Sequence, residues 1–204
     1  MTATIVPSLP LLCPATFVVS RGWTETSSCV IDADSVRWDN RHVNLAEVTG
    51  AAYRTRRRSL NLVQRRTERV VVLETASDRC VIEMGTNRFG PSDARAQHDL
   101  YASLVATLHS QVEPRLRGDL LRSIAAGGSP MIGGLQLDRC GVTSASSGIS
   151  IEWRQLPEAQ LERGVVVVRA TIEHPDRPVA SIPMLSTNAV LLPELLAEAT
   201  FAFS

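Results

Sequence analysis

The two halves of this 204-residue chain repeat one order of local patterns. In each half, a β-forming run is followed by a short turn, a second β-forming run, a break and an apolar helical stretch. These segments are residues 69–73, 78–82 and 93–112 in the first half, and residues 165–169, 176–182 and 190–203 in the second. Because strands and amphipathic helices must bury their apolar faces against one another, the repeat predicts two small modules of antiparallel strands, each closed by a helix.

Turn and helix signals divide the chain further. Strand-like runs are expected at residues 17–19, 28–31, 35–38, 43–48 and 79–84, with a long hairpin formed by residues 51–62 and 63–75. Ser92 is a good helix N-cap, and we expect Pro114 to end the helix. In the second half, strands are expected at residues 135–137, 141–142, 149–156, 164–172 and 178–184, with a turn at 174–176 and a helix at 189–201.

The expected fold class is α+β and mainly β, in two tandem modules. The first module covers residues 15–113, and a connector at residues 114–130 contains a short helical pattern at 119–126. The second, shorter module covers residues 131–204, and residues 1–14 are expected to form an extended arm on the first module. A hydrophobic content of 44% is enough for packed cores, while only 4% of residues are aromatic, so aliphatic side chains must fill them.

The strands that precede the hairpin region resemble those of a known family. Val43-x-Leu45-x-x-Val48 in the first half aligns with Ile151-x-Trp153-x-x-Leu156 in the second, and each is followed by a hairpin and a closing amphipathic helix. This arrangement resembles the bacterial, actinobacterial-type pleckstrin-homology-like domain. The resemblance implies an antiparallel β-barrel or sandwich in each module, and a role in binding proteins, peptides or lipids.

Arginine is the sharpest local signal. All 21 basic residues are Arg, a bias typical of a GC-rich genome such as that of an actinobacterium. Seven of them fall within residues 54–69, in the expected hairpin. The candidate partner-binding residues are Arg54, Arg56, Arg57, Arg58, Leu60, Leu62, Arg65, Arg66 and Arg69.

Several partners fit this Arg-rich hairpin. An acidic protein is the leading expectation, and the second half of the chain is itself net negative. Anionic lipid is the main alternative, since clustered Arg and apolar Leu suit a membrane surface, and nucleic acid also fits. A solvated hairpin, whose Arg residues only discourage edge pairing, remains open.

The sequence offers little for catalysis or cofactors. The four His residues are scattered, and Cys13, Cys29, Cys80 and Cys140 form no CxxC pair, so we predict neither a metal site nor a cofactor. No phosphate-binding loop or nucleophile motif is present. Cys80 lies in an apolar strand pattern and is expected in the core. We therefore expect a non-catalytic binding or scaffolding protein of the cytoplasm, where thiols stay reduced.

Overall fold

The computed structural model describes residues 15–21, 25–60, 64–85, 91–155, 157–170 and 174–204 of the chain. Their strands form four antiparallel sheets, and the fold is α+β and mainly β, as predicted. Within these residues, none of the sheets closes into a barrel. The expected arm at residues 1–14 lies outside the described residues.

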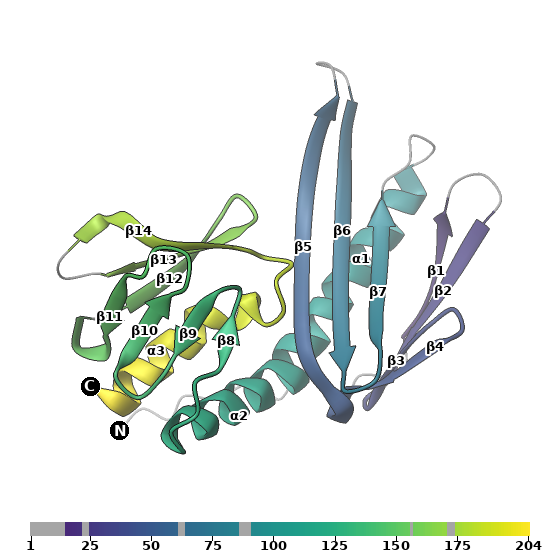
Figure 1. The fold of residues 1–204 in the computed structure, drawn as a ribbon. Coiled ribbons are helices and arrows are strands. Elements are labelled where there is room, and N and C mark those ends of the chain that lie inside the picture. Colours follow the sequence, from purple (N-terminus) through teal and green to yellow (C-terminus); the bar gives the residue numbers. More distant parts are fainter. Residues whose placement is uncertain (1–14, 22–24, 61–63, 86–90, 156, 171–173) are drawn as a thin grey trace, which may run out of the picture.

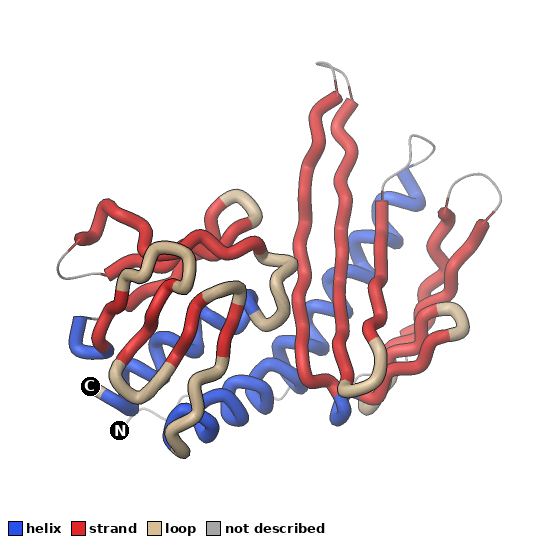
Figure 2. Tube along the Cα trace, viewed as in Figure 1, coloured by secondary structure: helices blue, strands red, loops and turns tan. Residues whose placement is uncertain are grey.

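The first half contains two sheets and a helical segment (Figures 1 and 2). One sheet has the order β1-β2-β3-β4, with β1 Ala15–Arg21, β2 Glu25–Ile31, β3 Ser35–Trp38 and β4 Arg41–Asn44. A 3₁₀ turn, η1 Leu45–Glu47, leads into the second sheet, β5-β6-β7, with β5 Val48–Leu60, β6 Gln64–Thr75 and β7 Arg79–Gly85. The helical segment consists of α1 Pro91–Thr107, the π turn η2 Leu108–Val112 and α2 Glu113–Ala125.

The second half repeats this order of elements, and most of its strands are shorter. Its first sheet, β11-β10-β9-β8, is formed by β8 Met131–Ile132, β9 Leu135–Leu137, β10 Gly141–Ser144 and β11 Ser150–Glu152. The 3₁₀ turn η3 Trp153–Gln155 leads into the sheet β12-β13-β14, formed by β12 Pro157–Glu162, β13 Val165–Ala170 and β14 His174–Pro183. The turn η4 Ala189–Leu191 and the helix α3 Leu192–Phe203 complete it.

The correspondence between the halves holds at one predicted position and differs at another. Val43 in β4 and Ile151 in β11 are both buried, and each lies two residues before a buried residue that opens a 3₁₀ turn. Val81 and Val179 were also expected to match. Val179 is in the second core, whereas Val81 is half-buried on the outward face of its sheet. Register shifts around Arg169, opposite β14, accompany this difference.

Two hydrophobic cores lie under the helices. Leu104 of α1 is fully buried in the first core, and Leu196 of α3 is fully buried in the second, as the helical spacing predicted. Leu120 of α2 packs against both cores, and so does Met184 from the segment after β14. The cores therefore adjoin, and α2 passes from one to the other. Cys80 is buried in the first core, as predicted.

The prediction that Pro114 ends the helix is wrong. The helix widens into a π turn at residues 108–112, where the N–H of Glu113 donates to the carbonyl of Leu108. Pro114 thus lies in the first turn of α2, where its missing N–H costs little. Residues 114–125 of the expected connector are consequently helical.

Three smaller elements also differ from the expectations. The expected strand at 43–48 stops at Asn44, because the Asn44 side chain accepts the N–H of Ala46 and caps a 3₁₀ turn. Strand β12 was not predicted, because its sequence is rich in Glu and Gln and starts with Pro157. Residues 174–176, expected as a turn, begin β14, an edge strand, and a Pro is tolerated there.

Candidate functional site

The predicted Arg-rich hairpin is present as a long two-stranded structure, and we call its residues 54–69 the ribbon. β5 and β6 pair in unbroken register from Ala51 opposite Leu73 to Leu60 opposite Gln64. β7 pairs with β6 only as far as Gly85 opposite Glu68. In the described structure, residues 57–60 and 64–67 therefore have no third strand beside them. Figure 1 shows the ribbon projecting beyond the sheet that carries it.

Strand alternation divides the seven Arg positions between two faces of the ribbon, which the sequence analysis did not anticipate. Positions 54, 56, 58 and 66 fall on the face turned away from α1, and positions 57, 65 and 69 fall on the helix side. Arg58 stands directly opposite Arg66 in the register, an arrangement that destabilises a strand pair when both residues carry the same charge.

The structure describes three of the candidate Arg side chains. Arg54 is half-buried and Arg56 is exposed, and neither makes a hydrogen bond or ion pair with a residue that the structure describes. Arg69 lies on the helix side, with its guanidinium carbon 6.0 Å from the ring centroid of Tyr101 on α1. Arg69 therefore contributes to packing between ribbon and helix. The side chains of Arg57, Arg58, Leu60, Arg65 and Arg66, and all of Leu62, lie outside the described residues.

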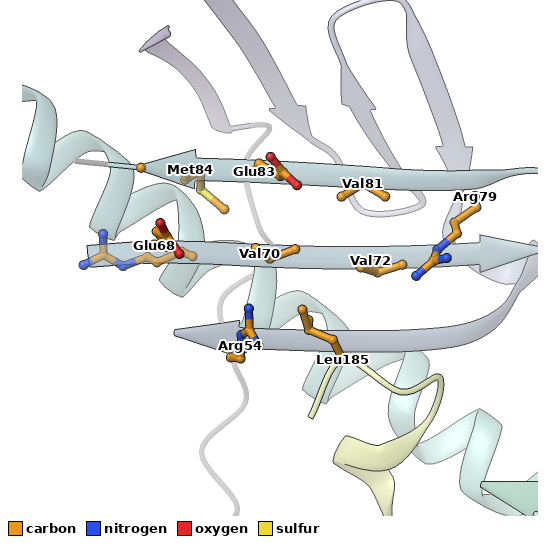
Figure 3. A pocket seen from close by; sticks show the side chains of 11 residues that line it. Arg54, Glu68, Val70, Val72, Arg79, Val81, Glu83, Met84 and Leu185 are labelled. Carbon is orange, nitrogen blue, oxygen red and sulfur yellow. The ribbon is translucent and has the colours of Figure 1, made fainter. Parts of the chain in front are cut away.

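A groove of about 500 Å³ lies on the outward face of the β5-β6-β7 sheet, at the base of the ribbon. Figure 3 shows the apolar side chains Val70, Val72 and Val81 along its floor and Leu185 reaching over from the second half. Charged side chains border this floor, namely Arg54, Glu68, Arg79 and Glu83. The groove therefore joins an apolar strip to the face that carries Arg54 and Arg56.

Hydrogen bonds between the halves fix one wall of this groove. Asn188 has a left-handed backbone, with φ of 64°, and its N–H donates to the carbonyl of Ala51 at 2.9 Å. Its side-chain oxygen accepts the N–H of Ala51 at 3.0 Å. Thr187 donates its hydroxyl to Glu74 at 2.8 Å. These bonds anchor the segment that carries Leu185 along the edge of β5.

Ion pairs on the helices hold the halves together at a second place. Arg117 of α2, with a side chain only 13% exposed, pairs with Glu194 and Glu198 of α3. Because one guanidinium group bridges two carboxylates of the neighbouring helix, it restrains α2 and α3 relative to each other.

A polar chain connects the ribbon sheet to the π turn. The Tyr53 hydroxyl donates to Glu113 at 3.0 Å, and His109 Nδ1 lies 3.1 Å from the other carboxylate oxygen. Glu113 is only 3% exposed. Burial, with the adjacent Glu113 carboxylate, raises the pKa of Tyr53. This chain ties β5 to the helix, and it lies away from the residues that line the groove.

Within the described residues, no group of three or more His, Cys, Asp and Glu side chains has the geometry of a metal site. No helix among them is both long and apolar enough to cross a membrane. No family model, curated protein or solved structure matches this chain.

Sequence reasoning missed the groove, because Leu185 and Asn188 are remote in sequence from β5. It also missed the division of the Arg residues between two faces. The division could have been predicted from the sequence, because successive side chains of a strand point to opposite faces and the Arg residues occupy both even and odd positions of the hairpin.

Proposed function

We propose that this chain is a non-catalytic binding or scaffolding protein that uses the outward face of the ribbon and its groove to hold an acidic protein partner. In this proposal, each half is a pleckstrin-homology-like module. Support comes from the repeated order of a four-stranded sheet, a 3₁₀ turn, a three-stranded sheet and a closing helix. The long ribbon occurs only in the first module, because β12 and β13 are joined by a short turn at residues 163–164.

The observation that carries the proposal is the placement of Arg54 and Arg56. Both cations lack a partner among the described residues, and Arg54 lines a groove with a valine floor. Arg is enriched at protein interfaces because its stem packs on apolar surface while its guanidinium binds carboxylates. A partner with acidic and apolar side chains satisfies both parts of this surface.

The acids in the groove favour a protein over a polyanion. Glu68 and Glu83 line the same hollow as Arg54. A lipid headgroup layer or a phosphate backbone presents only negative charge and would face repulsion there, whereas a protein segment places its charges individually. Anionic lipid or nucleic acid remains the second candidate, supported by the opposed positions of Arg58 and Arg66 at the far end of the ribbon.

We place this function in the cytoplasm. Cys29, Cys80 and Cys140 are free thiols in the structure, which supports a reducing compartment.

Comparison of the parent with a quadruple variant tests the proposal. In this variant, the four Arg positions of the outward face, namely Arg54, Arg56, Arg58 and Arg66, are each replaced with Ser. Both proteins are immobilised and exposed to a cell extract at about 50 mM salt, where charge interactions are weakly screened. We expect the parent to retain a discrete acidic protein, and to release it as salt rises, while the variant retains none and keeps its thermal stability.

Two parallel assays cover the alternatives. Sedimentation with anionic vesicles measures lipid binding, and a gel shift with nonspecific DNA measures nucleic-acid binding. Binding to vesicles or DNA without any retained protein would replace the proposed partner class. If the variant unfolds, the Arg side chains are structural and the proposal fails.

A further inference from the structure

The edge of β5 is already used for pairing by the chain itself. β5 is an outer strand of its sheet. At Ala51 both edge-facing backbone groups are bonded to Asn188, one to its N–H and one to its side-chain oxygen. Asn188 thus imitates a single residue of an added strand. The N–H and C=O of Ala51 therefore point away from β6. This orientation shows which alternate residues of β5 direct their backbone groups to the outer edge.

The orientation of Ala51 also identifies the residues further along β5 whose backbone groups face the outer edge. Backbone groups of an antiparallel strand alternate between its two sides, and the β5-β6 register has no bulge beyond Gly50. Tyr53, Thr55, Arg57 and Ser59 therefore direct their N–H and C=O groups to the outer edge of β5. Among the described residues, no backbone hydrogen bond reaches this edge beyond Ala51. Thr55 is exposed, so the edge is accessible there.

The outer part of the ribbon is short of neighbours. Beyond the pair of Arg56 and Glu68, no described strand lies on either side of β5 and β6. A two-stranded ribbon is only marginally stable alone, and a third strand adds backbone hydrogen bonds and cross-strand contacts. An added strand would therefore stabilise the ribbon as well as bind to it.

Charge decides which strand can be added. A second copy of β5 paired along this edge would bring the Arg positions 54–58 against one another, which like-charge repulsion disfavours. An acidic strand would instead place its carboxylates beside Arg54 and Arg56, which have no partner among the described residues.

We propose that the edge of β5 from Thr55 to Ser59 binds an extended acidic segment of another protein by strand addition. This inference rests on the proposed function, and it specifies how the acidic partner is bound. Backbone hydrogen bonds supply part of the affinity, and the outward Arg face selects the charge of the partner.

A peptide pair tests the backbone requirement on the full-length chain. The probe is a fluorescent peptide of alternating Glu and Thr, about eight residues long, the length of an ordinary strand. The control peptide has the same sequence and charge but carries N-methyl groups on all of its internal amides, which prevents pairing through either edge. By fluorescence anisotropy, we expect the control to bind at least about tenfold more weakly, a factor that the loss of a few net hydrogen bonds supplies.

A variant pair tests the protein side. Thr55→Pro removes an edge-facing N–H, which an outer strand tolerates, and we expect it to weaken probe binding at least about fivefold by the loss of one bond and local distortion. Thr55→Val keeps the N–H and serves as the matched control, because both variants lose the hydroxyl that bonds to Tyr101. We expect Thr55→Val to bind like the parent.

Amide exchange of the parent gives an answer that requires no variant, in case Thr55→Pro fails to fold. In the free protein, the amide of Thr55 should exchange rapidly, while that of Arg54, bonded to β6, should exchange slowly. Addition of the probe should slow exchange at Thr55.

Three results would overturn strand addition: no binding of the probe, equal binding of both peptides, or unchanged exchange at Thr55 in the complex. Equal binding of both peptides would leave the proposed function intact, because charge alone would then hold the partner. Retention of no protein in the extract experiment would refute the proposed function separately.

Discussion

The bond network of Asn188 gives a quantitative test of how the two halves are joined. In Asn188→Ala, the N–H of Ala51 loses its acceptor, and Ala51 is only 1% exposed. An unsatisfied buried donor costs about 1–3 kcal/mol. Because Asn188 has φ of 64°, where Asn is tolerated better than Ala, the left-handed backbone adds about 1 kcal/mol. The free energy of unfolding should therefore fall by about 2–4 kcal/mol.

Asn188→Gly is the matched control. Glycine lacks the side-chain acceptor but adopts positive φ without steric cost, while its greater freedom in the unfolded chain offsets part of that gain. We expect Asn188→Gly to be more stable than Asn188→Ala by about 0.5–1 kcal/mol. Urea unfolding followed by circular dichroism measures both. If Asn188→Ala lies within about 0.5 kcal/mol of the parent, the size of a neutral surface change, the junction does not depend on this bond.

Further predictions concern the cores, the helix junction and alkaline pH. Leu104→Ala and Leu196→Ala, each at a fully buried site in a different core, should each lower stability by about 2–5 kcal/mol in urea melts, whereas Phe201→Ala, at a site 94% exposed, should change it by less than about 0.5 kcal/mol. A melting temperature equal to the parent's in either Leu variant would contradict the placement of the helices. Arg117→Ala should lower the melting temperature by several degrees, at about 2–4 °C per kcal/mol, because two carboxylates of α3 lose their partner. An unchanged melting temperature would show that these ion pairs do not contribute to stability. Burial raises the pKa of the Cys29 thiol from 9.0 to about 12, so its contribution to stability is complete below pH 9 and is lost as pH rises toward 12. Between pH 9 and 11, the parent should therefore lose stability relative to Cys29→Ala by about 1.4 kcal/mol per pH unit, and parallel pH profiles would refute this.

Local patterns were sufficient for much of the fold. The apolar spacing that includes Leu104 and Leu196 identified both buried helix faces, because a helix that covers a sheet repeats its contacts every three to four residues. The strands of the first half were predicted where β-branched runs end at turn residues, as at Asp39 and Asn40. These features depend on neighbours in sequence, which is why they could be read from it.

Features that depend on packing between distant segments were not predicted. Pro114 indicated a helix end, but the π turn before it removed the conflict between proline and the helix ladder. The backbone of the ribbon was predicted from its turn, whereas the groove beside it needs Leu185 from the second half. The pairing of Ala51 with Asn188 joins residues 137 positions apart, and no local pattern marks such a contact.

Photo-crosslinking in cells tests the proposed function most directly. A photoreactive amino acid replaces Arg56, the exposed Arg of the outward face, and the same amino acid replaces Phe201, exposed on α3, in a control. After irradiation, we expect position 56 to give a discrete adduct with an acidic protein, absent from position 201 and lost when Arg54 is changed to Ser. Adducts only with lipid or nucleic acid, no protein adduct at position 56, or the same adducts at both positions would contradict a protein-binding role for the ribbon.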